Sequence, residues 1–368
     1  MGIEGNSATV PASAIAPEGA AASHDIRIRG LYKIFGRDGA RHVEAVKAGL
    51  SKEDLNDRHN HVLGLDDINL DIPQGQITVI MGLSGSGKST LLRHLNGLIA
   101  PTAGEVVFNG QNVAAMSGSA LREFRRTQTA MVFQKFALLP HRTVLENTTY
   151  GLDVRGVRKR DAREKARYWL ERVGLKGYEG YYPSQLSGGM QQRVGLARAL
   201  SNDAEILLMD EAFSALDPLI RVDMQSILLE LQKELRKTIV FITHDLDEAL
   251  RLGDKIAILR DGRLEQVGSR QDIVLRPAND YIARFVREVN RGRIIRAETI
   301  AYPLPEGEEM PEFIIRARNE LDLVARNMTR AGVSRGRVER RDGTHVGIID
   351  LASILDAMVN PAEVESDD

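Results

Sequence analysis

A glycine-rich segment supplies the clearest chemistry in the sequence. Residues 82–90 read Gly-Leu-Ser-Gly-Ser-Gly-Lys-Ser-Thr, which matches the phosphate-binding pattern G-x-x-x-x-G-K-[ST]. An apolar run over Ile77–Met81 precedes the segment, and a helical pattern over residues 88–96 follows it. Glycines let backbone N–H groups point into one concavity, and a helix start adds positive potential there. The sequence therefore predicts a site for nucleotide phosphates.

Several side chains of this segment have separate predicted roles. We expect Lys88 to reach the β- and γ-phosphates and the Ser89 hydroxyl to be a Mg²⁺ ligand. The predicted nucleotide-binding residues of the segment are Gly82, Ser84, Gly85, Ser86, Gly87, Lys88, Ser89 and Thr90.

A second helix start with glycines lies further along the chain, in Leu-Ser-Gly-Gly-Met-Gln-Gln-Arg over residues 186–193. Such a start can hold an anion, although an ordinary helix cap is the alternative. Because one nucleotide in one pocket does not need two such sites, we expect this one to cap the γ-phosphate held by another copy of the chain. The predicted nucleotide-binding residues here are Ser187, Gly188, Gly189 and Gln191.

Two carboxylates, Asp210 and Glu211, follow the apolar strand pattern of residues 206–209. Carboxylates at the carboxyl end of a strand face the nucleotide crevice of an open α/β sheet. We expect Asp210 to hold Mg²⁺ through its water shell and Glu211 to polarise the attacking water. The alternative is that both acids lie on a solvated surface, but that would not explain why the strand before them, residues 206–209, is entirely apolar.

Two polar residues complete the predicted catalytic set. Gln134 follows a strand pattern, and its amide is expected to contact Mg²⁺ or the attacking water. His244 follows the strand pattern of residues 239–243, and its imidazole is expected to hydrogen-bond the γ-phosphate and to fix Glu211. Either residue alone more often serves structure, but their spacing with the other motifs indicates catalysis.

An aromatic residue near the N-terminus is the predicted contact for a nucleotide base. Phe35 ends a strand pattern and is expected to stack on adenine. Tyr32 is its competitor, and a core aromatic at a strand end is the structural alternative.

The elements that must position these residues alternate between strand and helix patterns. The predicted strands carry few polar residues, which is typical of a largely parallel sheet covered by helices on both faces. The fold class is therefore α/β, of the P-loop nucleotide-hydrolase type. The predicted strands are Ile26–Phe35, Val62–Ile72, Ile77–Met81, 130–133, Ile206–Asp210, Thr238–Thr243 and Lys255–Arg260.

The domain organisation follows from shifts in composition. Residues 1–24 are predicted to be a disordered tail, 25–290 the nucleotide-binding domain, 37–61 a helical insertion starting near Ser51, 291–312 a proline-punctuated linker and 360–368 an acidic tail. Residues 313–359 read as a β-α-β-β-α module: strand 313–316, helix Leu321–Ala331, strands 335–340 and His345–Asp350, and helix Leu351–Val359.

Composition excludes several other classes of protein. The 368 residues carry 49 Lys+Arg and 51 Asp+Glu, so no global basic field exists to hold nucleic acid. The cysteine count is zero, which excludes disulfides and thiolate chemistry. No apolar run approaches the roughly 18 residues of a membrane span. Since no secretory signal is visible, the expected location is the cytoplasm.

Together these motifs resemble the ATP-binding subunits of ABC transporters over residues 26–290, in the family's order. Residues 82–90 are identified as Walker A, Gln134 as the Gln loop, 186–193 as the signature, Asp210 and Glu211 as Walker B, and His244 as the His switch. The finer resemblance is to importers of glycine betaine, choline and related quaternary amines. It is carried by the 37–61 insertion and by residues 133–141 and 210–221.

The resemblance implies an ATPase that uses ATP and Mg²⁺ and has a β-subdomain and a helical subdomain. It implies a homodimer beneath two transmembrane permease subunits, peripheral on the cytoplasmic face of the inner (plasma) membrane. A periplasmic or extracellular substrate-binding protein acts indirectly. The alternatives are another ABC importer or an exporter, and more remotely an ABC ATPase acting on DNA or ribosomes.

The C-terminal module resembles one CBS motif, where longer members of the family carry two. We expect it to be regulatory or dimer-stabilising. The apolar face formed by Leu351, Ile354, Leu355 and Met358 either meets a second copy or packs on its own strands. A set of arginines either binds anionic lipid or nucleotide, or is a solvated surface: Arg316, Arg318, Arg335, Arg337, Arg340 and Arg341.

Overall fold

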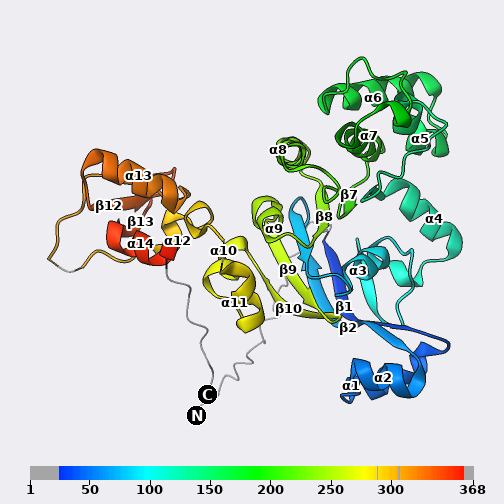
Figure 1. Ribbon diagram of the computed structural model, residues 1–368, viewed down its shortest axis with the longest axis horizontal. Helices are drawn as coiled ribbons and strands as arrows, with labels where there is room; N and C mark the ends of the chain where they lie inside the picture. The colour runs from blue at the N-terminus through cyan, green and yellow to red at the C-terminus, as the bar shows by residue number, and fades with distance from the viewer. Residues whose placement is uncertain (1–24, 288, 306, 360–368) are drawn as a thin grey trace, which may run out of the picture.

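A computed structural model describes residues 25–287, 289–305 and 307–359, and its central element is a six-stranded sheet (Figure 1). The strand order is β10-β9-β3-β8-β7-β6, with β10 antiparallel to β9 and the other neighbours parallel. The bounds are β3 Ile77–Met81, β6 Thr129–Phe133, β7 Ile206–Asp210, β8 Thr238–Thr243, β9 Lys255–Arg260 and β10 Arg263–Gly268.

Both faces of this sheet are covered, as the strand patterns predict. Every residue of β3 and β8 is buried. Since side chains of a strand alternate between faces, β8 supplies two separate hydrophobic cores. Phe241 belongs to one core, and Val240 and Ile242 belong to the other. The predicted P-loop α/β fold, with its largely parallel sheet, is confirmed.

A second, antiparallel sheet has the order β2-β1-β4-β5. Strands β1 (Ile26–Phe35) and β2 (Val62–Ile72) lie where the alternating patterns predict them. Strands β4 (Ala103–Phe108) and β5 (Gln111–Asn112) were not predicted, and β4 pairs with β1. The apolar side of this sheet contributes Ile28, Leu70 and Val106 to the core shared with the central sheet.

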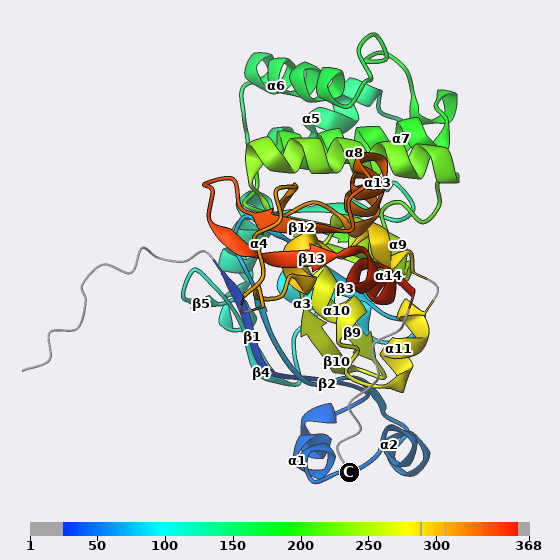
Figure 2. The ribbon, with the colours of Figure 1, turned by 90° about the vertical axis from the view of Figure 1, so that its left-hand side faces the viewer.

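Outside the 37–61 insertion and the C-terminal module, the α-helices form two groups (Figures 1 and 2). One group stands at the end of the molecule opposite the 37–61 insertion in Figure 2: α5 (Val144–Val154), α6 (Lys159–Arg172), α7 (Gly188–Ser201) and α8 (Pro218–Leu235). The other group packs nearer the sheets: α3 (Lys88–Leu95), α4 (Gly118–Thr127), α9 (Leu246–Leu252), α10 (Arg270–Leu275) and α11 (Asp280–Val286). In the described part of the chain, no helix combines the length and apolar character needed to cross a bilayer.

The insertion at 37–61 is helical, with η1 (Gly39–His42), α1 (Val43–Lys47) and α2 (Lys52–His59). The Ser51 hydroxyl accepts a hydrogen bond of 3.0 Å from the Asp54 backbone N–H, so Ser51 is the N-cap that the sequence predicts. Leu55 is fully buried and packs in a small core with Val43 and Val46. The insertion is therefore anchored to the end of the antiparallel sheet.

The C-terminal module contains the predicted order of elements. They are β11 (Ile314–Arg316), α13 (Leu321–Ala331), β12 (Arg335–Glu339), β13 (His345–Asp350) and α14 (Leu351–Val359). β12 lies between β11, to which it is parallel, and β13, to which it is antiparallel. The tails predicted at 1–24 and 360–368 lie outside the described residues.

The predicted linker at 291–312 needs a correction. Its first part forms η4 (Arg291–Arg293) and α12 (Ala297–Ile300), and Ile295 and Ala297 are fully buried in the core of the C-terminal module. Tyr302 makes a β-bridge with Ile348 of β13. Proline punctuation begins only at Pro303, so the apolar residues before it are free to pack. Residues 291–302 are part of the module rather than a free linker.

Helix α14 packs mainly against its own module. Ile354 is fully buried in the module core, and Leu351 and Met358 pack against that core. Leu355 is 56% exposed. Of the two arrangements that the sequence leaves open for this face, packing within the module is the one observed, with Leu355 as the exception.

Ile354→Ala is expected to destabilise the C-terminal module by about 2–5 kcal/mol because it leaves a cavity in the core. Leu355→Ala is the matched control on the same helix and should stay within about 0.5 kcal/mol of the wild type. Urea unfolding followed by a probe inside residues 313–359 measures both. Equal losses would contradict the packing described here, because Leu355 would then also be covered.

Candidate nucleotide-binding site

The segment between β3 and α3 can adopt its shape only because of its glycines. Gly87 has φ +105°, and a Cβ there would lie 2.7 Å from the Gly64 carbonyl oxygen. A Cβ on Gly82 would lie 2.1 Å from the Leu259 carbonyl oxygen. The loop is therefore pressed against the ends of β2 and β9, and no larger residue fits at these positions.

Lys88 lies inside this loop with only 5% of its surface exposed. Its Nζ donates to the carbonyl oxygens of Gly82 at 2.8 Å and Leu83 at 2.9 Å. Burial lowers the pKa of Lys88, and the negative charges of Glu211 and Asp210 oppose that effect. The ammonium is held where the predicted phosphates bind.

The oxygens that would hold Mg²⁺ are adjacent. The Ser89 hydroxyl donates to Asp210 Oδ1 at 2.9 Å, which brings residues 121 positions apart together. The Ser86 hydroxyl is buried and has no hydrogen-bond partner among the described residues. Mg²⁺ is commonly bound by one or two protein oxygens together with substrate phosphates, so this donor set fits the ion. In the described chain no group of three or more His, Cys, Asp or Glu side chains forms a metal site of its own.

Glu211 is the residue on which the predicted catalytic side chains meet. Its Oε2 lies 3.3 Å from Gln134 Nε2 and 3.3 Å from His244 Nδ1, and its Oε1 lies 3.8 Å from Lys88 Nζ. Glu211 has φ +45°, a costly conformation for a residue with a side chain, and its N–H donates to the Ile242 carbonyl oxygen at 3.1 Å. The ends of the neighbouring parallel strands β6, β7 and β8 thus place Gln134, Glu211 and His244 together, and the start of α3 brings Lys88 to them.

The aromatic contact predicted for the base is Phe35, and the structure separates it from its competitor. Phe35 is 39% exposed and lines a cleft of about 300 Å³ whose other lining residues include Gly64, Lys88 and Glu211. Tyr32 is 7% exposed and packs in the core of the insertion. Of these two aromatic residues, Phe35 is therefore the one that shares a cleft with the P-loop.

The signature residues lie elsewhere. Ser187 is the N-cap of α7, where its hydroxyl accepts a 3.3 Å hydrogen bond from the Met190 N–H. Gly188 is exposed and Gly189 is half-buried. The Gln191 amide donates to the carbonyl oxygens of Pro183 and Leu186 and so holds its own loop. Among the described residues, none of the signature set lines the cleft of Phe35 and Glu211. Helix α7 belongs to the helical group away from α3 (Figure 1).

Two arginines of this region were missed by the sequence analysis. Arg198 of α7 donates to the carbonyl oxygens of Ala137 at 2.7 Å and Phe136 at 3.2 Å, and both of these residues have positive φ. It fastens the loop after Gln134 to the signature helix. Arg221 donates to Asp245 Oδ2 at 3.2 Å and so joins the start of α8 to the start of α9. Since their partners lie 61 and 24 positions away, no local pattern marks either arginine.

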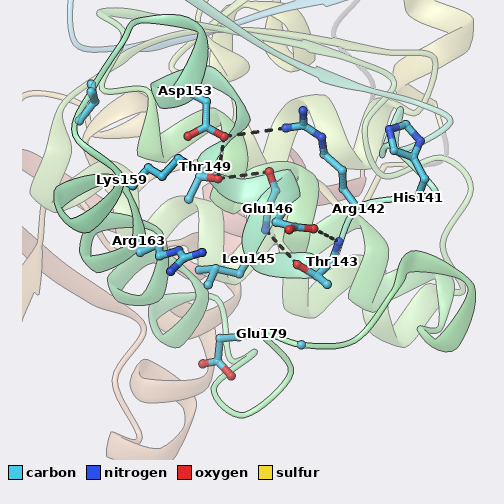
Figure 3. A pocket seen from close by; sticks show the side chains of 12 residues that line it. His141, Arg142, Thr143, Leu145, Glu146, Thr149, Asp153, Lys159, Arg163 and Glu179 are labelled. Atoms are coloured by element: carbon cyan, nitrogen blue, oxygen red, sulfur yellow. Dashed lines mark hydrogen bonds and ion pairs between the residues drawn. The ribbon is translucent and has the colours of Figure 1, made fainter.

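The loop after Gln134 ends at a charged groove of about 720 Å³ on the helical group (Figure 3). Asn147 is fully buried and binds the loop, donating to the carbonyl oxygens of Leu139 and Arg142 at 3.0 Å. Figure 3 shows Arg142 and Asp153, whose charged groups are 3.8 Å apart, among the lining side chains. One loop therefore connects Gln134 to this groove.

A P-loop, a strand-end carboxylate pair and a separate glycine-rich helix start are typical of ABC ATPases. The chain matches the ABC transporter family over residues 65–214. It is 51% identical over 282 residues to the glycine betaine transport ATP-binding protein OpuAA of Bacillus subtilis, covering 75% of this chain and 68% of that protein. It is 46% identical over 343 residues to the glycine betaine/proline betaine transport system ATP-binding protein ProV of Salmonella typhimurium, covering 93% and 84%.

Further similarities agree with these. The trimethylamine N-oxide transport system ATP-binding protein TmoW of Ruegeria pomeroyi is 43% identical over 335 residues, covering 91% of this chain and 97% of that protein. A solved dimeric bacterial ABC transporter cassette is similar with a TM-score of 0.57 and 32% identity, covering 67% of this chain and 98% of that chain. The same cassette is also known bound to ADP and Pi. The chain belongs to the family of ABC transporter ATP-binding proteins that contains those of glycine betaine transport.

Glu211→Gln is expected to retain ATP binding and to lower the ATPase rate by roughly 10²–10⁴-fold, because the isostere keeps the shape and removes the base. The variant should also accumulate an ATP-bound dimer. ATPase assays and sedimentation with ATP measure both effects. Glu234→Gln, which alters an acid paired with Arg172 outside the cleft, is the control and should behave as wild type. Turnover of Glu211→Gln within a few-fold of wild type would remove the role assigned to Glu211.

Proposed function

We propose that the chain hydrolyses ATP to power import of glycine betaine or a related quaternary ammonium compound through a membrane permease. The observation that carries the hydrolytic part is the Glu211 carboxylate, which Gln134, His244 and Lys88 all approach in the P-loop cleft. Relatives are named for glycine betaine, proline betaine and trimethylamine N-oxide, all small methylated nitrogen compounds. That shared chemistry supports the substrate class.

The proposed hydrolysis divides the work among the residues of the cleft. Lys88 and the backbone N–H groups of residues 82–90 bind the phosphates of ATP, and Phe35 stacks on its adenine. Mg²⁺, held by Ser89, Asp210 and in some states Gln134, would neutralise the charge that develops on the phosphates. Glu211 polarises the attacking water, and His244 orients Glu211 and contacts the γ-phosphate.

The proposed assembly is a homodimer beneath two permease subunits at the cytoplasmic face of the membrane, with a binding protein on the far side. The similarity to a dimeric cassette supports the homodimer. In that arrangement Ser187 of one copy caps the γ-phosphate bound to the P-loop of the other. ATP then favours the closed dimer by its differential affinity for the two states, and hydrolysis removes that preference.

The groove beside α5 is the proposed contact for the permease. Its lining carries both charge signs, including Arg142, Glu146, Asp153 and Arg163. It is joined to Gln134 by the loop that Asn147 and Arg198 hold in place. Closure of the dimer would move this loop and groove together and so pull on the permease.

The trans arrangement predicts that two inactive variants rescue each other. Ser187→Arg blocks the signature contact, and Lys88→Ala disables the P-loop. In a heterodimer of the two, one composite site carries both lesions and the other carries neither. Partial ATPase activity is therefore expected after mixing.

The measurement needs heterodimers isolated through two different affinity tags, with each parent homodimer as the control. An isolated heterodimer as inactive as both parents would contradict the trans arrangement in which one intact site supports turnover.

The C-terminal module is proposed to be a single CBS-like unit that regulates the dimer or stabilises it. Its arginines Arg316, Arg318, Arg340 and Arg341 line a hollow of about 850 Å³. Three acids, Glu298, Glu339 and Asp342, line the same hollow. The mixed charge is compatible with a solvated surface and with an anion site. In either case we propose that the module is dispensable for hydrolysis.

Truncation after Asn290 is expected to leave the ATPase rate within a few-fold of the full chain, because every proposed catalytic group precedes Asp245. Removal of the module uncovers Leu275, which packs against its core, so folding is checked by thermal unfolding and nucleotide binding. A folded, nucleotide-binding truncation without ATPase activity would show that the module is part of the catalytic unit. Assays across ionic strengths then test whether it regulates.

A further inference from the structure

One residue that lines the P-loop cleft, Lys52, belongs to none of the ATPase motifs. Lys52, from the 37–61 insertion, lines the cleft together with Phe35, Ser84, Gly85, Lys88 and Glu211. It is the first residue of α2, and the motifs of the family account for the P-loop residues and for Glu211 but not for Lys52. A cationic side chain from the insertion therefore shares a cleft with the P-loop.

Lys52 is held beside the P-loop by the turn between β9 and β10. Its Nζ lies 3.5 Å from Asp261 Oδ1, and the neighbouring Gly262 N–H donates to the Ser86 carbonyl oxygen at 3.0 Å. The side chains of Lys52 and Asp261 are 36% and 69% exposed. Because exposed ion pairs contribute little, the ammonium is able to leave Asp261 for a stronger anion.

The backbone that carries Lys52 is well fixed. Ser51 caps α2, and the fully buried Leu55 anchors the helix one turn later. At the base of the insertion the His61 ring joins its two ends, with Nδ1 2.6 Å from the His59 carbonyl oxygen and Nε2 2.7 Å from that of Arg37. Gly36 leaves room for this ring, because a Cβ there would lie 2.3 Å from it. The insertion presents Lys52 from a rigid support.

We propose that Lys52 is a nucleotide-binding residue, contributed by the insertion, whose ammonium pairs with a phosphate of ATP bound in the cleft. This inference rests on the proposed assignment of the P-loop cleft as the nucleotide site. Lys88 is already engaged by loop carbonyls and lies near Glu211, so Lys52 is a second, more accessible cation for the phosphates. Charge-assisted hydrogen bonds to phosphate are among the stronger polar contacts in proteins.

The experiment measures binding of ATP, ADP and adenosine to the full chain by isothermal titration, together with steady-state ATPase kinetics. Lys52→Gln is expected to raise the Kd for ATP by about 3–30-fold and leave that for adenosine unchanged, since only phosphate contacts are lost. The KM for ATP should rise while kcat stays near wild type. Lys52→Arg keeps the charge and should bind ATP within a few-fold of wild type.

A matched control lies in the same insertion. Lys47 pairs with Glu44 at 2.9 Å and lies outside the cleft, so Lys47→Gln should not change ATP binding.

Asp261→Asn removes a negative charge beside Lys52 and should tighten ATP binding rather than weaken it. This variant also keeps the test informative if Lys52→Gln folds poorly.

The outcomes distinguish a failure of the nucleotide-site assignment from a failure of the role proposed for Lys52. If Lys88→Ala binds ATP as well as wild type, the assignment of the cleft itself fails. If Lys88→Ala weakens binding but Lys52→Gln and Asp261→Asn do not change it, only the role of Lys52 is overturned. An equal loss of ATP and adenosine binding in Lys52→Gln would also overturn the pairing with phosphate.

Discussion

The constraint on which the site depends is that parallel strands bring their carboxyl ends to one edge of the sheet. Glu211 leaves β7 in a left-handed conformation, and its N–H is bound to the carbonyl of Ile242 on the neighbouring strand. Its carboxylate is therefore fixed within 3.3 Å of Gln134 and His244, which follow β6 and β8. The strand ends therefore set the relative positions of these three side chains.

The signature residues lie away from that edge of the sheet. The signature start at Ser187 belongs to the helical group, and Arg198 on the same helix holds the loop that follows Gln134. One helix thus carries both the signature start, which we propose faces a second copy, and the anchor of the loop that follows Gln134.

Local patterns predict most of the fold and most of the residues that the structure brings together in the candidate site, because a P-loop or a buried strand is specified by neighbouring residues. The sequence alone does not show whether Phe35 or Tyr32 faces the cleft, since β1 has register shifts that break the alternation of its faces. Arg198 was missed because its partners are distant in sequence. The prolines from Pro303 onward predict a linker over 291–312, but Ile295 and Ala297, in short apolar stretches before them, are buried in the module core.

The absence of a free joint between the described cassette and its C-terminal module has a mechanical consequence. Arg291 donates to the Val274 carbonyl oxygen at 3.0 Å, Thr299 hydrogen-bonds Gln271, and Leu275 packs into the module's core. All three contacts are made by residues of α10, so this helix fastens the cassette to the module. In the proposed dimer, fluorophores attached to the two modules would therefore move with their cassettes, so that a change in the distance between the cassettes could be measured far from the nucleotide sites.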